Sequence, residues 1–154
     1  MPTFTVTRNA LIPARPDEVY PFVVDFHKWT AWSPWESLDP GMSRTFSGSE
    51  AGVGAKYAWA GRKAGSGTME IQEAEEPNSI RIRLVFTKPM KAVNPTVFTF
   101  MPEDGGTRVT WTMTGETKGI GRLFALFMNM DKMVGKDFDK GLAALASAVA
   151  SARA

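Results

Sequence analysis

Cysteine is absent from this chain of 154 residues, and histidine occurs once, at His27. Without cysteine the chain forms no disulfides and no thiolate metal sites, and it is compatible with a reducing cytoplasm. A single histidine leaves only carboxylates as further metal ligands, and no paired acids stand beside it at a helical ligand spacing. We therefore expect no dedicated zinc or iron site and no cofactor.

A strong charge of one sign is also lacking. The 18 basic and 16 acidic residues are interspersed and leave a net charge of +2. Arg81 and Arg83 share one strand face, but no basic stripe follows a path that could track phosphates, so we do not expect a nucleic-acid partner. The glycine pairs at 52–54 and 119–121 match no phosphate-binding fingerprint, and we interpret them as a hairpin turn and a helix entrance.

Long hydrophobic runs are missing as well. No apolar stretch approaches the roughly 20 residues that a membrane-spanning helix needs. Thr3, Thr5 and Arg8 interrupt the start of the chain, where a signal peptide would carry an apolar segment. We therefore expect a soluble, cytoplasmic protein, and the length predicts a single domain over residues 1–154.

Most of the chain alternates between apolar and polar residues, as a strand covered on one side does. Ile80, Ile82 and Leu84, for example, alternate with Arg81 and Arg83. Glycine, proline and asparagine turn signals separate the alternating segments. The predicted strands cover residues 3–12, 42–48, 54–61, 66–75, 79–87, 94–102 and 107–116.

Two short helices are expected between the first two strands. Pro16 suits the first turn of a helix, and Pro21 should keep that helix short or kink it. A second helix is predicted over 25–32 and is expected to stop at Ser33-Pro34.

The last third of the chain predicts helices with a broad apolar face. We expect a short helix over 120–129 and a longer one over 131–152, with Asn129 and Asp131 capping the second. Gly135 and Gly141 should allow this helix to approach the sheet closely. The apolar stripe contains Ile120, Phe124, Phe127, Val134, Phe138, Leu142, Leu145 and Val149. The opposite face is interpreted as solvated and contains Lys132, Lys136, Asp137, Asp139 and Lys140.

This β-α-α-β×6-α order favours an α+β fold in which a curved sheet wraps the final helix. It resembles the START-like, Bet v 1-like (SRPBCC) superfamily, and within it the bacterial polyketide cyclase/dehydrase and lipid transport group. The stretches that carry the resemblance are 26–36, 52–55, 106–111 and 135–142. The resemblance implies a helix-grip fold, with a curved seven-stranded antiparallel sheet around a long C-terminal helix and a cavity between them.

Several large side chains on the expected inner face are candidates for lining that cavity. Nine methionines support an adaptable cavity, because methionine fills irregular shapes. Trp29 is assigned to the core, whereas Trp32 and Trp35 fit core and cavity equally well. Indole N–H groups and the Tyr57 hydroxyl would serve a ligand oxygen. The candidate lining residues are Trp32, Trp35, Glu36, Tyr57, Trp59, Met69, Phe98, Phe100, Trp111, Met113, Phe124, Phe127 and Met128.

Few residues are candidates for catalysis. Glu36 is either a buried acid beside Trp35 that could transfer a proton, or simply solvated. A nucleophilic triad would have to be built on His27, and Asp25 is expected on the wrong side of a helix to orient it. A structure with Glu36, His27 or Asp131 inside the cavity near Tyr57 would favour an enzyme.

Three functions therefore stay open. The first is binding or transport of a small hydrophobic, lipid- or polyketide-like molecule, and the second is a cyclase/dehydratase-type enzyme. The third is a co-chaperone-like interaction domain, which predicts a filled interior instead of a cavity. The apolar stretch 123–128 is a candidate for a gate over the cavity or a homodimer contact.

Overall fold

The computed structural model describes residues 3–88, 91–116 and 122–153, and in the last helix it describes side chains from Val134 to Ala152. The elements are β1 (Thr3–Ile12), α1 (Pro16–Val19), α2 (Pro21–Val24), the 3-10 helix η1 (Phe26–Ala31), α3 (Pro34–Leu38), β2 (Ser43–Gly48), β3 (Ala55–Gly61), β4 (Gly65–Glu75), β5 (Ser79–Lys88), β6 (Ala92–Glu103), β7 (Gly106–Glu116) and α4 (Arg122–Arg153).

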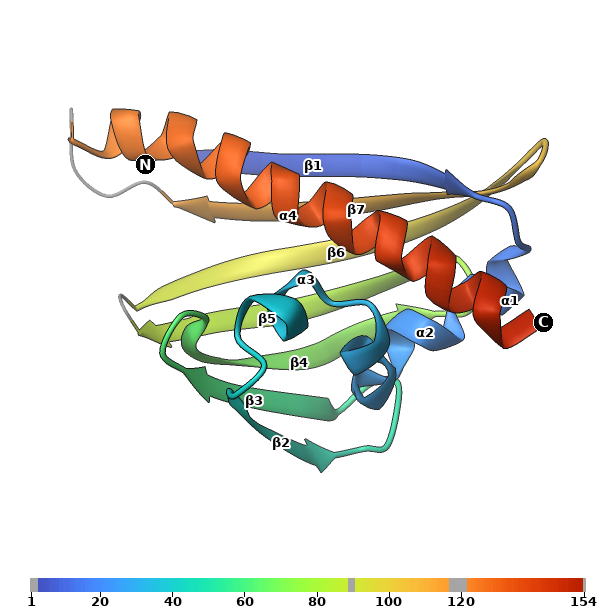
Figure 1. The fold of residues 1–154 in the computed structure, drawn as a ribbon, viewed down its shortest axis with the longest axis horizontal. Helices are drawn as coiled ribbons and strands as arrows, with labels where there is room; N and C mark the ends of the chain where they lie inside the picture. Colours follow the sequence, from blue (N-terminus) through green and yellow to red (C-terminus); the bar gives the residue numbers. More distant parts are fainter. Residues whose placement is uncertain (1–2, 89–90, 117–121, 154) are drawn as a thin grey trace.

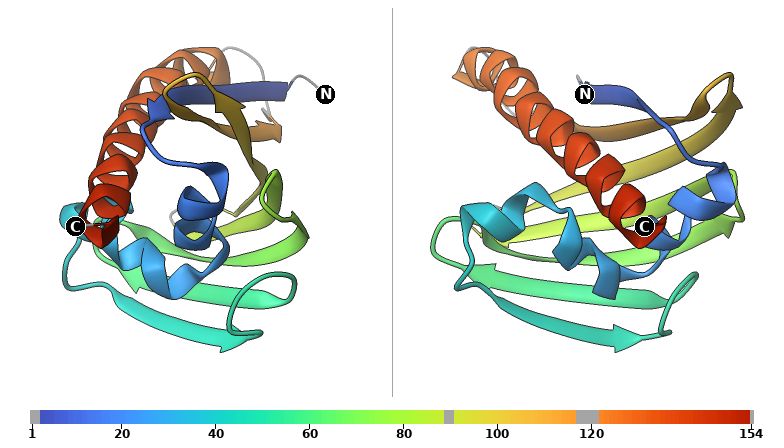
Figure 2. Two further views of the ribbon diagram at one scale, coloured as in Figure 1. Left: turned by 90° about the vertical axis from the view of Figure 1, so that its right-hand side faces the viewer. Right: turned by 45° about the vertical axis from the view of Figure 1, so that its right-hand side comes forward.

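The strands form one antiparallel sheet in the order β1-β7-β6-β5-β4-β3-β2. The sheet curves, and α4 crosses its concave side diagonally (Figures 1 and 2). The small helices between β1 and β2 lie on that same side: α1 contacts β6 and β7, and η1 contacts β3 (Figure 1). The predicted α+β helix-grip fold and its seven strands are confirmed, with strand ends within two residues of the predicted ones.

The connection between β1 and β2 contains four short helical elements, whereas two helices were predicted. The expected break at Pro21 is confirmed, because α1 ends at Val19 and α2 begins at Pro21. The predicted stop at Ser33-Pro34 is confirmed, because η1 ends at Ala31, but a further helix, α3, begins there and was not predicted. Ser33 has extended backbone angles and Pro34 is the first residue of α3. Proline suits this position because the first helical N–H has no partner inside the helix.

The C-terminal region is one helix, so the prediction of two helices separated near residue 130 is wrong. Asn129 and Asp131 lie within α4 and do not begin a new helix. No proline or glycine occurs between Arg122 and Val134, and asparagine or aspartate inside a helix costs only about 0.7 kcal/mol relative to alanine.

The predicted contact of the C-terminal helix with the sheet is confirmed. The Phe138 ring of α4 stacks on Trp111 of β7, with ring centroids 4.0 Å apart. A Cβ atom at Gly141 would lie 2.9 Å from Cζ3 of Trp111, so a side chain there would collide with the sheet. At Gly135 a Cβ atom would meet the guanidinium group of Arg8 on β1.

The alternation along the strands places the core on the concave side of the sheet. The buried core residues include Ile71, Ile80, Ile82, Phe98, Phe100, Val109, Phe138, Leu142, Leu145 and Val149. Within the described residues, no helix combines the length and the apolar character that crossing a membrane requires.

Candidate functional site

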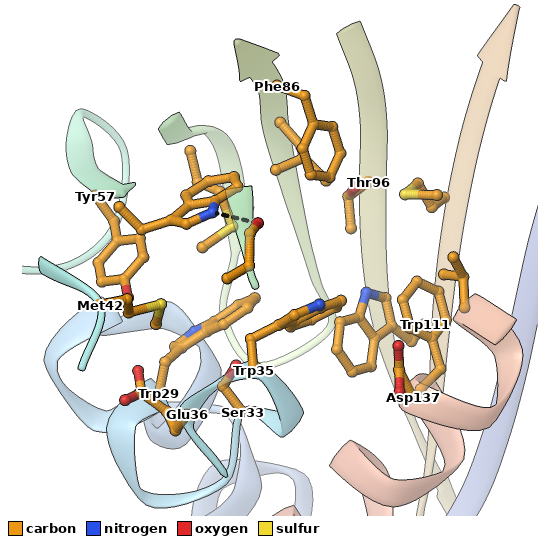
Figure 3. Close-up of a pocket in the computed structure, with 17 residues that line it drawn as sticks. Trp29, Ser33, Trp35, Glu36, Met42, Tyr57, Phe86, Thr96, Trp111 and Asp137 are labelled. Carbon is orange, nitrogen blue, oxygen red and sulfur yellow. Dashed lines mark hydrogen bonds between the residues drawn. The ribbon is translucent and has the colours of Figure 1, made fainter. Parts of the chain in front are cut away.

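The core contains a cavity of about 240 Å³ between the concave face of the sheet and the helices η1, α3 and α4 (Figure 3). Strands β3 to β7 supply eight of its seventeen lining residues, and helices and connections supply the others. The lining residues are Trp29, Ser33, Trp35, Glu36, Met42, Tyr57, Trp59, Ala64, Met69, Leu84, Phe86, Thr96, Trp111, Met113, Val134, Asp137 and Phe138.

Tryptophans dominate the wall. Four of the five lie on it, and Figure 3 shows the indoles of Trp29, Trp35 and Trp111 in a row along one side. The Nε1–H of Trp29 donates to the carbonyl of Val23 over 2.8 Å, which fixes that ring. Trp35 and Trp111 meet edge to face, with centroids 6.1 Å apart. These rings form a rigid, apolar surface that suits a flat ligand.

One end of this row is polar, because Glu36, Arg44 and Tyr57 gather there. Both carboxylate oxygens of Glu36 accept hydrogen bonds from the Arg44 guanidinium, one of them over 3.1 Å from Nε. Arg44 also donates to the carbonyl of Met42 over 3.1 Å. The side chains of Glu36 and Arg44 are only 14% and 25% exposed, so solvent screens this pair weakly.

Tyr57 keeps its hydroxyl proton over the whole physiological range. Burial and the adjacent Glu36 carboxylate raise the pKa of Tyr57 to about 12, although Arg44 opposes the shift. Its hydroxyl is therefore a neutral hydrogen-bonding group at this end of the cavity. The ring stacks beside Trp59, with centroids 6.3 Å apart.

Asp137 lies at the other end of the row, near Trp111 (Figure 3). The prediction that Asp137 belongs to a solvated helix face is wrong, because its side chain lines the cavity. It precedes Phe138, whose ring is buried against the sheet, and so it stands at the edge of the apolar stripe. Burial raises the pKa of Asp137 above its ordinary value, and Lys140 partly opposes this.

Most of the candidate lining residues lie on the cavity wall, but three do not. Trp35, Glu36, Tyr57, Trp59, Met69, Trp111 and Met113 line it. Trp32, Phe98 and Phe100 lie in the solid core instead. Trp32 donates its Nε1–H to the carbonyl of Phe22, Phe98 lies against Trp111, and Phe100 meets Tyr20 edge to face. The side chains of Phe124, Phe127 and Met128 lie outside the described residues.

Sequence reasoning missed several residues of the wall. Leu84 and Phe86 follow the inner-face alternation of β5, and Val134 and Phe138 belong to the apolar stripe, so these signals were present. Trp29 was assigned mostly to the core, and it is a core residue that also lines the cavity. Ser33, Met42 and Ala64 stand on connections, and Thr96 and Asp137 are polar, so no sequence pattern marks them.

The expectation that Asp25 faces away from His27 is wrong. Asp25 has extended backbone angles and caps η1 instead of lying in a helix. Its carboxylate accepts hydrogen bonds from the His27 backbone N–H over 3.0 Å and contacts Nδ1 over 2.8 Å. The imidazole stacks on Phe46 and is 52% exposed, and it does not line the cavity. His27 is thus oriented, but away from the site.

Metal ligands do not gather in the part of the chain that the structure describes: no group of three or more histidine, aspartate or glutamate side chains could hold an ion there. Asp131, the remaining candidate acid, belongs to the segment of α4 whose side chains are not described.

Comparison with solved structures supports the same fold. Protein CV1439 from Chromobacterium violaceum superposes with a TM-score of 0.69 at 19% identity, over 95% of this chain and 97% of that one. Ara h 8.0201 gives 0.68 at 17% identity, over 97% and 99%. The Aha1 dimer from Colwellia psychrerythraea gives 0.64 at 14% identity, over 94% and 95%.

No curated protein matches the sequence. At these identities the solved structures show the shared fold alone. The family described as polyketide cyclase / dehydrase and lipid transport matches residues 3–150, which is nearly the whole chain. The chain therefore belongs to the polyketide cyclase/dehydrase and lipid transport family, within the Bet v 1-like SRPBCC superfamily.

Proposed function

We propose that this protein binds a small, mostly apolar molecule in the cavity between the sheet and α4. The observation that carries the proposal is the cavity itself, whose wall is built mainly of tryptophan, methionine, leucine and phenylalanine side chains. Domain interiors are normally packed without voids larger than a water molecule. An apolar space of about 240 Å³ is therefore a place for a ligand.

The volume limits the ligand to about two fused rings or a short branched chain. An engineered apolar cavity of about 150 Å³ stays dry and binds benzene. This cavity is larger than that by more than half, and it lies just below the usual range of roughly 300–1,000 Å³ for drug-sized ligands. Transfer of apolar surface out of water, at about 25 cal/mol per Å², would drive binding.

Naphthalene is a suitable first probe because it has this size and no polar group. We expect it to bind, as measured by equilibrium dialysis, and to raise the melting temperature, since a ligand that binds only the folded state stabilises it. Leu84→Trp should abolish binding, because a larger ring at residue 84 fills the cavity. The matched control is Leu11→Trp, which adds the same ring at a position that is 41% exposed.

The proposal fails if naphthalene leaves both measurements unchanged, or if Leu84→Trp and Leu11→Trp bind it equally well. If naphthalene binds, native mass spectrometry of protein purified from its own host, followed by solvent extraction, would identify the natural ligand. Recovery of an apolar compound of about naphthalene size would support the proposal independently.

A cyclase- or dehydratase-type enzyme is the second candidate function. Glu36 lies on the cavity wall near Tyr57, which is the arrangement that this function requires. However, Arg44 donates hydrogen bonds to both oxygens of Glu36, so this carboxylate is already engaged in an ion pair. Asp137 would be the better acid–base group, because burial already favours its protonated form.

The interaction-domain alternative has less support. It requires a filled interior together with an exposed apolar patch. The large exposed hydrophobic residues among the described side chains belong to different elements: Leu11 to β1, Leu38 to α3, Val53 to a turn, and Val93 and Met101 to opposite ends of β6.

A further inference from the structure

The described residues that line the cavity include two carboxylates but no lysine, arginine or histidine. The two carboxylates belong to Glu36 and Asp137. The charge of Glu36 is neutralised by its ion pair with Arg44, a residue that does not line the cavity. Asp137 has neither a hydrogen bond nor an ion pair within the described part of the chain, and the cation that acts on it is Lys140, an exposed residue on the same helix.

A second polar group at the same end of the cavity also lacks a partner. Trp111 is only 2% exposed, and its Nε1–H has no acceptor among the described residues. Because no fully buried side-chain nitrogen or oxygen there lacks a partner, this N–H must be reachable from the cavity. The indoles of Trp29, Trp32 and Trp59 all donate to backbone carbonyls. The Trp111 N–H is therefore available to a hydrogen-bond acceptor on a ligand, or to water.

These two groups restrict the chemistry of the ligand. An anionic ligand, such as a carboxylate, would bring a second negative charge close to Asp137 in a weakly screened site. A neutral hydrocarbon would cover Asp137 without giving it a partner, and a desolvated carboxylate without a partner is unfavourable. A cationic ligand, by contrast, would form a charge-assisted hydrogen bond with it.

We propose that the ligand is a lipophilic amine whose ammonium group pairs with the carboxylate of Asp137. Its apolar body lies along the row of Trp29, Trp35 and Trp111, and a hydrogen-bond acceptor on the same molecule faces the Nε1–H of Trp111. This inference rests on the proposed function, because it assumes that the cavity binds a ligand, and it adds the chemical class of that ligand.

Three probes with one ring system test the charge preference: naphthylmethylamine, naphthylmethanol and naphthoate. At about pH 7 they are cationic, neutral and anionic, respectively. We expect the amine to bind at least about tenfold more tightly than the alcohol in equilibrium dialysis, and naphthoate to bind most weakly, since a charge-assisted hydrogen bond is stronger than a neutral one.

Asp137→Asn should abolish the preference for the amine while the alcohol binds as before. The matched control is Asp139→Asn, which removes the same charge two residues away at a position where the side chain is 60% exposed. This variant should keep the preference. If Asp137→Asn does not fold, the affinities of the three probes for wild type and for Asp137→Glu test the inference instead. Glutamate retains the charge, so Asp137→Glu should bind the probes in the same order of affinity as wild type.

The outcomes separate this inference from the proposed function. Equal affinities for amine and alcohol in the wild type, or an unchanged preference in Asp137→Asn, would overturn the amine assignment while the cavity remains a binding site. Failure of all three probes, and of naphthalene, would overturn the proposed function and the amine assignment together.

Discussion

Asp39 shows how a single carboxylate shapes the wall of the cavity from outside it. Its Oδ2 accepts hydrogen bonds from the backbone N–H groups of Lys63 over 2.9 Å and Ala64 over 3.1 Å. Ala64 lines the cavity, and its carbonyl accepts the Nε1–H of Trp59. Asp39 thereby holds the turn between β3 and β4 in place. Gly61 is required beside it, because a Cβ atom there would collide with the carboxylate.

Asp39→Asn should destabilise the protein in a pH-dependent way. Hydrogen bonds from the Ala64 and Lys63 amides hold the pKa of Asp39 below its usual range. The folded state therefore binds this proton less readily than the unfolded state does, and the stabilisation is complete above the ordinary aspartate pKa of about 3.9. It is lost as the pH falls through the lower, folded-state value.

Urea denaturation of both proteins over a series of pH values measures this effect. The difference in unfolding free energy between wild type and Asp39→Asn should be largest at about pH 7 and should shrink below about pH 4. Glu50→Gln, at an exposed position, is the control and should show little difference at any pH. A difference for Asp39→Asn that does not change with pH would contradict the role given to its charge.

At the scale of the element, two glycines of α4 serve different purposes. A Cβ atom at Gly141 would lie 2.9 Å from the Trp111 ring and 3.1 Å from Cδ of Pro34, and neither neighbour moves easily. At Gly135 the atoms met belong to the end of the Arg8 side chain, which is flexible. The sequence alone gives both glycines the same meaning, namely a weak point in a helix.

The changes in stability caused by Gly141→Ala and Gly135→Ala should therefore differ in sign or in size. Alanine favours the helix by about 1 kcal/mol at either site. Overpacking at Gly141 should cost about 1–3 kcal/mol, so we expect that variant to lose stability. Gly135→Ala should be neutral or slightly stabilising, because the Arg8 side chain can move aside. Thermal denaturation of the pair checks this, and equal losses in both variants would contradict it.

At the scale of the whole molecule, the contact between α4 and the sheet closes the cavity and completes the core. Phe138 stacks on Trp111 with an interplanar angle of 7°, and the ring centroids of Phe98 and Trp111 are 4.9 Å apart. Three rings from α4, β7 and β6 thus form one continuous contact across the interior.

Phe138→Ala should reduce the unfolding free energy by about 3–5 kcal/mol, the usual cost of removing a buried phenylalanine. It should also enlarge the cavity, so that probes larger than naphthalene bind. Met101→Ala, at a position that is 58% exposed, should change stability by no more than about 0.5 kcal/mol. A small loss in Phe138→Ala, measured by urea denaturation, would show that α4 does not stabilise the fold through this stack.

Much of the fold and part of the site could be predicted from local patterns. Alternation along β5 places Leu84 and Phe86 on the inner face, and the proline at residue 21 predicts the break between α1 and α2. Local patterns did not predict which of two similar side chains lines the cavity and which lies in the core. Trp29, Trp32 and Trp35 follow one another at three-residue steps, so the sequence pattern does not distinguish Trp32 from Trp35. Trp32 nevertheless packs in the core against Phe98, whereas Trp35 lines the cavity.

The sequence by itself determined the class of fold, the seven strands and the apolar face of the last helix, because period-two and helical periodicities are local properties of the chain. Only the tertiary structure decided which side chains surround the cavity. That choice brings Glu36 of α3 to Arg44 of β2 and places Asp137 of α4 beside the sheet. Such contacts join residues from different helices and strands, and they depend on the twist of the sheet and on the angle at which α4 crosses it.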